Sequence, residues 1–451
     1  MIYVQLIFAF IIIFLAGRIL LGLRIFGINR EPAEVRFPLY FFAGTSLIGL
    51  YMLILSLLNF RYSVASIAFP IILLSIPALR SIRDIQPPAL KLPRFNLSIE
   101  LISFLCLGLI CAAMLIDGFV SPVFSKDAFA MWFFKAKMIF MEKRIPFEVF
   151  RQPYYAYSSP EYPLLAPLNL AWISLCLGLW NDILLRMFFI VQYMLFIPFF
   201  YSSLKRYTNR NMAALGCLLL MANRHVLVYA ANGYLDLMVG MFTAISAIYL
   251  IKWMNEKDKG HLLLSAFFIG CAAFTKYEGI ALFLAMAVTL ALFLLANKGK
   301  AGFRGSIAGF SAFIALAALV FGPGQLASLV HHMSSHMIKN ANIIATTIAN
   351  TGRIPQIAGH FFFQLYLNTF SWQYFWIFIT IFLIVGWRRI FGTNMKYLLL
   401  FLLISLAIYF EVYILTVANN LESSFHRLLI GLAPSFVYLV ISSAPKDDVQ
   451  Q

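Results

Sequence analysis

The chain has 451 residues, of which 62% are hydrophobic and only 12% are charged. Soluble domains carry about 25% charged residues, so this composition excludes a soluble globular protein and indicates a membrane protein with many spans. The net charge of +16 is typical of Lys and Arg in cytoplasmic loops. Because the chain lacks the basic motifs of nucleic-acid-binding proteins, we expect no nucleic-acid partner.

Apolar runs of about 16 to 21 residues follow one another along the chain without strand-like alternation, which predicts an all-α, polytopic transmembrane fold. The first run has no basic segment before it and no small-residue cleavage site, so we interpret it as a retained span. The five cysteines all lie inside apolar runs, where they are typical packing residues. About thirteen spans are predicted, near 2–17, 38–58, 62–79, 98–116, 183–203, 211–230, 234–252, 261–275, 279–296, 303–322, 372–387, 396–416 and 427–443.

Basic residues are concentrated in short connections between these runs. Placing all of these connections in the cytoplasm obeys the positive-inside rule, and it puts the N-terminus outside and the C-terminus inside. This predicts an integral protein of a plasma (inner) membrane. The basic segments are 18–37, 80–97, 204–210, 252–260, 297–305, 388–396 and the tail with Lys446.

One further apolar run, 163–180, does not fit as a span. The polar loop that begins at Asp117 must lie outside, segment 204–210 must lie inside, and run 183–203 already crosses between them. We therefore interpret 163–180 as a re-entrant or interfacial helix on the outer side, with Pro163 and Pro167 helping to keep it from spanning. A different loop topology, in which this run spans, is the alternative.

With this topology, ionisable residues from separate parts of the chain lie at the outer ends of the spans. A charged side chain in lipid costs about 2.5 to 3.5 kcal/mol, so a group of them at one face indicates a function. A carboxylate at the rim of an outward-facing cavity suits a general base. Cations at its floor suit a phosphate whose tail stays in the lipid. The residues are Asp127 on the outer loop, Arg224 and His225 near the end of 211–230, Asp236 at the start of the next span, Lys276 and Glu278 in a tight turn, and His426 and Arg427 at the start of the last span.

Several of these segments resemble motifs of the GT-C superfamily of polytopic glycosyltransferases, which includes protein mannosyltransferases and lipid A aminoarabinose transferases. Segment 127–137 (DAFAMWFFKAK) looks like the first-loop acidic motif with its juxtamembrane helix, and 160–167 (PEYPLLAP) looks like the Pro-rich segment that follows it. Arg186 looks like the Arg that opens the next span. The remaining similarities are 234–237 (YLDL), 275–279 (TKYEG) and 422–434 (ESSFHRLLIGLAP).

The resemblance implies a fold and a function. It implies juxtamembrane helices in the first large outer loop and transfer of a sugar from a polyprenyl-phosphate donor, with inversion, to a glycan, lipid or protein acceptor outside the cytoplasm. We expect Asp127 to be the catalytic base. Phosphate binding is assigned to Lys276, Arg427, Arg224 and Arg186, with Asp236, Glu278, Glu161, His225, His426 and Tyr162 as supporting polar groups.

The chain departs from the family pattern in two places. Ala128 follows Asp127 where a second acidic residue is frequent, so we name no metal ligand and no cofactor, although a divalent metal stays open. Three spans instead of one precede the span that leads into the first loop. The expected organisation is 1–97 as additional N-terminal spans, 98–300 as the catalytic membrane module with outer loop 117–182, and 301–451 as C-terminal spans with outer loop 323–371.

Simpler roles remain for single residues, and other functions remain for the chain. Arg186 and Arg427 can be interface anchors, Asp236 and Arg224 can form a structural ion pair, and Lys135 is expected to extend to the lipid headgroups. A transporter or flippase of a lipid-linked substrate is one alternative, but it predicts internal repeats and ionisable groups at the bilayer midplane. A polysaccharide ligase or polymerase, which would use the same class of donor, is the other.

Overall fold

The computed structural model describes residues 1–80, 98–297, 303–333, 343–415 and 421–444, and within these residues it contains helices and no strand, as the all-α prediction expects. The helices of the first half are α1 (Ile2–Leu21), α2 (Ala33–Leu57), α3 (Val64–Arg80), α4 (Ile99–Val120), α5 (Phe134–Glu142), α6 (Phe147–Phe150), α7 (Leu165–Leu177), α8 (Asp182–Leu185), α9 (Met187–Lys205), α10 (Arg210–Met221) and α11 (Arg224–Ala231). Those of the second half are α12 (Asp236–Glu256), α13 (Lys259–Thr275), α14 (Tyr277–Ala296), α16 (Phe303–Val330), α17 (Ile343–Ala349), α18 (Ile354–Phe362), α19 (Thr369–Trp372), α20 (Phe375–Gly392), α21 (Met395–Leu415) and α22 (Leu421–Ser442). Short 3-10 or π turns are η1 (Arg24–Phe26), η2 (Ile28–Arg30), η4 (Ala128–Phe133), η5 (Pro153–Ser158), η6 (Thr351–Arg353) and η7 (Phe363–Leu367).

Among the described residues, ten helices are long and apolar enough to cross a membrane. The number is eleven if α10 and α11, which meet at a bend of 62°, form one broken span. The chain is thus an integral membrane protein, with fewer qualifying spans than the thirteen predicted. The difference lies in 211–230, which is the bent pair, and in 62–79 and 261–275, whose helices α3 and α13 are apolar but shorter than the other spans.

The run 163–180 forms α7, a helix of 13 residues. At 1.5 Å per residue it is about 20 Å long, which is too short for the roughly 30 Å hydrocarbon core. Nearly all of its residues are buried, because it packs against α1, α2 and α5. Trp172 donates a hydrogen bond from Nε1 to the Ala9 carbonyl, and Asn169 donates one to the Thr45 carbonyl.

The first two helices pack with their backbones in contact. A Cβ atom on Gly17 of α1 would lie 1.7 Å from the Tyr40 carbonyl oxygen, and one on Gly44 of α2 would lie 1.7 Å from the Ile13 carbonyl oxygen. Membrane helices without a water-driven hydrophobic effect rely on such close approach of small residues. The pair therefore forms a rigid support on which α7 rests beneath the first large loop.

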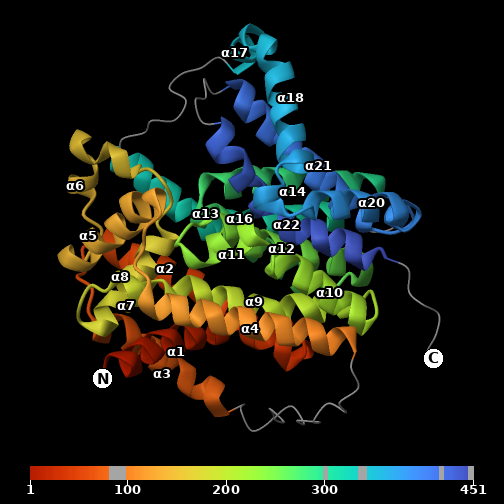
Figure 1. Cartoon of the computed structure of the whole chain (residues 1–451). Helices are drawn as coiled ribbons and strands as arrows, with labels where there is room; N and C mark the ends of the chain where they lie inside the picture. The colour runs from red at the N-terminus through yellow and green to blue at the C-terminus, as the bar shows by residue number, and fades with distance from the viewer. Residues whose placement is uncertain (81–97, 298–302, 334–342, 416–420, 445–451) are drawn as a thin grey trace.

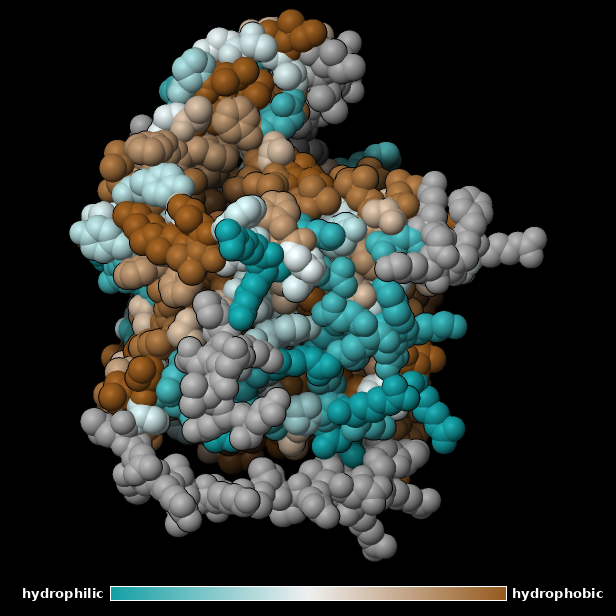
Figure 2. All heavy atoms as spheres, turned by 90° about the vertical axis from the view of Figure 1, so that its right-hand side faces the viewer, coloured by the Kyte–Doolittle hydropathy of each residue, from teal (hydrophilic) through white to brown (hydrophobic). Residues whose placement is uncertain are grey.

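The long helices lie roughly side by side, so that the bundle has two distinct ends (Figure 1). One end carries α5, α6, α7 and the N-terminus and is called here the loop end. The other carries the α9–α10 connection and the C-terminal end of α22 and is called the basic end. Figure 2 views the basic end and shows hydrophilic residues across the middle of this face with apolar residues bordering them.

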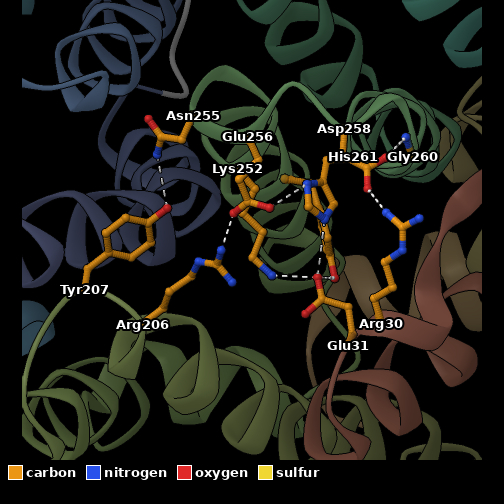
Figure 3. A network of polar contacts seen from close by, with 11 residues as sticks. Arg30, Glu31, Arg206, Tyr207, Lys252, Asn255, Glu256, Asp258, Gly260 and His261 are labelled. Carbon is orange, nitrogen blue, oxygen red and sulfur yellow. Dashed lines mark hydrogen bonds and ion pairs between the residues drawn. The ribbon is translucent and has the colours of Figure 1, made fainter.

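At the basic end, ion pairs and hydrogen bonds join connections that are far apart in the sequence (Figure 3). Four of the segments predicted to be cytoplasmic, 18–37, 204–210, 252–260 and 388–396, contact one another there, which agrees with their assignment to one side. Segments 80–97 and 297–305, except for their first or last residues, and Lys446 lie outside the described residues. The contacts are Arg30–Asp258 at 2.7 Å, Lys252–Glu31 at 2.7 Å, Arg206–Glu256, His261 with Glu31 and Glu256, and Asn394–Asn255 at 2.8 Å.

Candidate active site

At the loop end, five ionisable side chains from four segments of the chain form one connected cluster, called here the ion cluster. Arg427 bridges two carboxylates, with 2.5 Å between Nη1 and Asp127 Oδ2 and 3.3 Å between Nη2 and Asp236 Oδ2. Lys276 bridges the second of these to a third carboxylate, with 2.9 Å from Nζ to Asp236 Oδ1 and 2.7 Å to Glu278 Oε1. The structure therefore brings together the predicted base and two of the four predicted phosphate-binding cations.

Two local features bring Asp127 and Asp236 to the same cation. Asp127 directly precedes the π-helical turn η4, a form of helix that is rare and frequent at functional sites. The chain enters α12 through Gly233, which has a φ of +75°. A Cβ atom there would lie 2.7 Å from the Phe133 ring of η4, so a residue other than glycine would be strained and would push the two segments apart.

The ion cluster is largely shielded from solvent. The side chains of Asp236 and Lys276 are 3% and 6% exposed, whereas that of Asp127 is 31% exposed. The cavity between Asp236, Lys276, Glu278, Arg427 and Tyr409 has a volume of only about 10 Å³, about the space for one water molecule. Two buried atoms in this region, Arg427 Nε and Glu278 Oε2, have no hydrogen-bond partner among the described residues.

Lys276 lies in the turn between α13 and α14 and stays charged despite its burial. Burial lowers the pKa of its amine, but the carboxylates of Asp236 and Glu278 outweigh burial and raise the pKa above its ordinary value. A second cation, Arg427, sits with its guanidinium carbon 4.8 Å from the centre of the Tyr234 ring. The site thus holds two permanent positive charges in surroundings of low polarity, which strengthens any charge-assisted hydrogen bond they donate.

Glu161 and Tyr162 lie beside the ion cluster. The Tyr277 hydroxyl donates a 2.6 Å hydrogen bond to the Glu161 carbonyl, and the rings of Tyr162 and Tyr277 lie 4.7 Å apart. Burial raises the pKa of the Tyr162 hydroxyl, and the carboxylates of Glu278 and Glu161 raise it further. Glu161 is buried, and its Oε2 atom has no hydrogen-bond partner in the part of the chain that the structure describes.

Lys135 is a site residue whose surroundings the sequence did not reveal. The prediction that its side chain extends to the lipid headgroups is wrong, because the side chain is completely buried. Its amine donates a 3.0 Å hydrogen bond to the Ser159 carbonyl and lies 4.7 Å from the centre of the Trp132 ring. Burial lowers the pKa of Lys135 to about 7, and the Glu161 carboxylate offsets only part of this effect. Tyr409 was also missed, since a tyrosine within an apolar run gives no signal of a site, and Tyr234 and Tyr277 were not assigned a role although both lie in the family-like segments 234–237 and 275–279.

The two predicted histidines connect the ion cluster to its surroundings. His426 directly precedes Arg427, and its Nε2 atom lies 3.2 Å from the Tyr229 hydroxyl. The His225 ring lies 4.8 Å from the His426 ring and 5.1 Å from the Trp372 ring. His426 and His225 therefore place a pair of imidazole rings between Arg427 and Trp372.

The remaining two predicted cations lie outside the ion cluster. Arg186 is fully buried, pairs with Asp117 at 2.5 Å, and donates to the carbonyls of Ser121 and Ala231. It therefore ties the ends of α4 and α11 to the start of α9. Arg224 is exposed, and its guanidinium carbon lies 3.7 Å from the centre of the Phe370 ring. It pairs with no carboxylate in the described part of the chain, so an ion pair with Asp236 does not form.

Residues 162–323 match the model of the family described as dolichyl-phosphate-mannose-protein mannosyltransferase. The matched region contains Asp236, Lys276 and Glu278, whereas Asp127 and Arg427 lie outside it. This match confirms the resemblance to the GT-C superfamily. No significant match to the chain occurs among curated proteins or among solved structures.

Proposed function

We propose that this chain, a membrane glycosyltransferase of the GT-C type that uses a polyprenyl-phosphate-linked sugar, transfers that sugar to an acceptor on the extracytoplasmic face with inversion at the anomeric carbon. The observation that supports this most is the ion cluster. Its members come from the first large loop and from the ends of three later helices, and they lie at one end of the bundle. A single ion pair with a purely structural role would need only two of these residues, so it does not account for the meeting of four segments.

In this proposal Arg427 and Lys276 hold the donor phosphate. Phosphate oxygens accept charge-assisted hydrogen bonds from both side chains, and these bonds strengthen as the leaving phosphate gains charge. The two cations now face three carboxylates, so a further anion fits only if one carboxylate withdraws. Asp127 is the member best suited to withdraw, because it is the most exposed of the three and has Arg427 as its only ionic partner among the described residues.

The withdrawal of Asp127 on donor binding also prepares this carboxylate for catalysis. While Asp127 is paired with Arg427, its Oδ2 atom lies 2.5 Å from the guanidinium and is occupied by that contact. Once the donor phosphate occupies Arg427, Asp127 is free to accept the proton of the acceptor nucleophile. The nucleophile then forms its bond to the anomeric carbon from the face opposite the phosphate, and the bond from that carbon to the phosphate oxygen breaks. We therefore infer that the donor binds before the acceptor.

We further propose that the loop end lies outside the cytoplasm, with the N-terminus outside and the C-terminus inside a plasma (inner) membrane. The grouping of basic connections at the other end supports this orientation. In this arrangement α3, the α10–α11 pair and α13 cross the membrane with the ten longer helices, and α7 stays on the outer side.

The proposed domain organisation has three parts. Residues 98–300 form the family-like module, residues 1–97 are an N-terminal addition, and residues 301–451 complete the site with Arg427. The acceptor is then a glycan, lipid or protein that reaches the outer loops 117–182 and 323–371.

The proposal is tested with purified protein in liposomes and a labelled polyprenyl-phosphate sugar. We expect the wild-type protein to bind and consume the donor, and we expect an Arg427→Ala, Lys276→Ala double variant to lose donor binding while remaining folded. Arg206→Ala, which removes a paired arginine at the basic end, is the control and should bind normally. In the same liposomes, a cysteine at Tyr155 should react with an impermeant reagent on the side where acceptor is consumed, and a cysteine at Thr208 on the other.

Wild-type donor affinity in the double variant would reject the assignment of the phosphate site. Labelling of the cysteine at position 208 on the side where acceptor is consumed would reject the orientation. Release of the polyprenyl phosphate with retention of configuration in the product would reject the single displacement in which Asp127 acts as base.

A further inference from the structure

A pocket lies at the basic end, at the opposite end of the bundle from the ion cluster. Its volume is about 320 Å³, within the range of roughly 300 to 1,000 Å³ that is typical of small-molecule sites. It lies where the α9–α10 connection, the end of α12, the α20–α21 connection and the end of α22 meet, so parts of the chain that are far apart in the sequence build it together. The lining residues are Tyr207, Ile251, Asn255, Arg389, Thr393, Asn394, Met395, Ser442 and Ser443.

Arg389 gives this pocket a positive charge that the ion pairs of the basic end do not balance. Among the described residues, the one acceptor that Arg389 contacts is the Ala444 carbonyl, and no carboxylate pairs with it. None of the described residues that line the pocket is acidic. Glu256, which follows a lining residue in the sequence, is already paired with Arg206 and His261. Because a guanidinium has five N–H donors, Arg389 keeps donors for an anionic ligand.

Two further features of the pocket favour an anion. Ser443 is 2% exposed, and its Oγ atom has no hydrogen-bond partner in the part of the chain that the structure describes. Because Ser443 lines the pocket, a ligand there supplies the partner that a buried hydroxyl needs. Thr393 and Asn394 lead directly into α21, which has 21 residues and no acidic residue in its first turn, and the N-terminus of a helix attracts negative charge.

The walls of the pocket are held by hydrogen bonds between its own side chains. Asn394 donates a 2.8 Å hydrogen bond to the Asn255 side-chain oxygen, and Asn255 donates one of 3.3 Å to the Tyr207 hydroxyl (Figure 3). The Thr393 hydroxyl donates a 2.8 Å hydrogen bond to the Arg389 carbonyl. These contacts order the walls before a ligand binds, which lowers the entropy cost of binding.

We propose that this pocket binds a phosphate group, with the Arg389 guanidinium and the Ser443 hydroxyl as donors in front of the start of α21. Phosphate oxygens suit these donors, because they accept charge-assisted hydrogen bonds from a guanidinium. The pocket lies at the ends of spans, where basic pockets between helices bind the headgroups of anionic lipids. A soluble phosphorylated molecule offers the same chemistry. The proposal is independent of sugar transfer, since the pocket shares no residue with the ion cluster.

The test compares phosphatidylglycerol with a diacylglycerol that has the same acyl chains and no phosphate. Delipidated full-length protein in detergent should bind phosphatidylglycerol, as measured by native mass spectrometry, and should become more stable to thermal unfolding. Diacylglycerol should do neither. Glycerol phosphate, which has no acyl chains, is the soluble probe. Stronger binding of phosphatidylglycerol than of glycerol phosphate would identify a lipid headgroup as the ligand, and the reverse order would identify a soluble phosphorylated molecule.

Three variants assign the binding to the pocket. Arg389→Gln should weaken binding of the phosphate-bearing probe about 10- to 100-fold, as the loss of a hydrogen bond to a charged group does. Ser443→Ala should weaken it about 2- to 10-fold and leaves the contact between Arg389 and Ala444 intact. Arg388→Gln is the matched control, because Arg388 is exposed and lies next to Arg389 without lining the pocket, and it should bind like the wild type.

Thermal unfolding without ligand checks that each variant is folded, and Ser443→Ala decides the question if Arg389→Gln does not fold. Equal binding of diacylglycerol and phosphatidylglycerol would overturn the proposal, because the phosphate would then make no difference. Wild-type affinity for the phosphate-bearing probe in the folded variants Arg389→Gln and Ser443→Ala would also overturn it, as would the absence of binding of either phosphate-bearing probe to the wild type. None of these results would affect the proposed function.

Discussion

The two ends of the bundle each carry a network of ion pairs, but the networks are built differently. In the basic-end network the ion pairs join three cations to three carboxylates, and in the ion cluster two cations face three carboxylates. The two networks also differ in how many of their side chains are exposed to solvent. Arg30 and Arg206 are 80% and 48% exposed at the basic end, whereas at the loop end only Asp127 is more than a quarter exposed.

This comparison motivates the proposal that the two networks have different roles, structural at the basic end and catalytic at the loop end. A balanced network needs no further ligand, and most of its exposed pairs contribute little to stability, about 0 to 1 kcal/mol each. Its function is to hold loops from distant parts of the chain together (Figure 3). The unbalanced cluster keeps a buried Arg427 nitrogen and a buried Glu278 oxygen without partners, which is costly unless a ligand uses such groups. Under the proposed function, the same types of residue therefore serve different purposes at the two ends.

The largest expected effect is on the reaction at the loop end. Asp127→Asn keeps the shape of the side chain but removes the proposed base, and the loss of a general base typically lowers the rate by about 10² to 10⁴. Single-turnover measurement of sugar transfer should show this fall in rate, while donor binding stays intact because Arg427 and Lys276 remain. Full activity of Asp127→Asn, together with loss of activity in Asp236→Asn or Glu161→Gln, would move the role of base to one of those carboxylates.

The matching change at the basic end should affect stability alone. Glu31→Gln leaves Lys252, whose side chain is 4% exposed, without its carboxylate at 2.7 Å. Removal of one partner of a buried ion pair costs about 3 to 5 kcal/mol, which thermal unfolding in detergent should detect. Transfer per folded molecule should equal that of the wild type. A variant with normal unfolding but reduced transfer would contradict the division of roles between the two ends.

The sequence predicted the class of fold and most of the ion cluster. Apolar runs located ten of the thirteen predicted spans as long helices, because the membrane imposes the length of a span. The predicted orientation indicated which ionisable residues share an end, and Asp127, Asp236, Lys276, Glu278 and Arg427 do meet there. Hydropathy did not reveal that 211–230 is bent by 62° or that α3 and α13 are short, since the ends of helices depend on the packing of neighbouring helices.

The surroundings of Arg186, Arg224 and Lys135 could not be predicted from the sequence. Each is a cation near the outer end of a span, and the sequence treats them alike. In the structure, the first is buried among backbone carbonyls, the second is exposed on an aromatic ring, and the third is buried under the first loop. Their surroundings depend on contacts between segments far apart in the chain, such as Lys135 with Ser159, and no periodicity in the sequence records such contacts.

The last expected effect concerns Lys135, whose surroundings differ from those of the lysines in the two networks. Both networks pair each lysine with a carboxylate, whereas Lys135 has a carbonyl as its hydrogen-bond partner, and burial lowers its pKa from 10.5 to about 7. Between these two pH values the unfolded chain still holds the proton and the folded chain has released it. The free energy of unfolding therefore rises with pH in this window, by up to about 1.4 kcal/mol per pH unit from this group. Below about pH 7 both states are protonated and this contribution to the slope disappears.

Lys135→Met should remove that contribution, because Met fills the same space without a titrating group. Chemical unfolding in detergent at several values of pH from 7 to 10 should therefore give a smaller slope for the variant than for the wild type, and a higher stability at the low end of the range. Lys137→Met is the matched control, since Lys137 is two residues away on the same helix and exposed, and its slope should equal that of the wild type. Equal slopes for Lys135→Met and the wild type would mean that the amine keeps its proton throughout, and that the nearby Glu161 carboxylate stabilises the charge more strongly than burial opposes it.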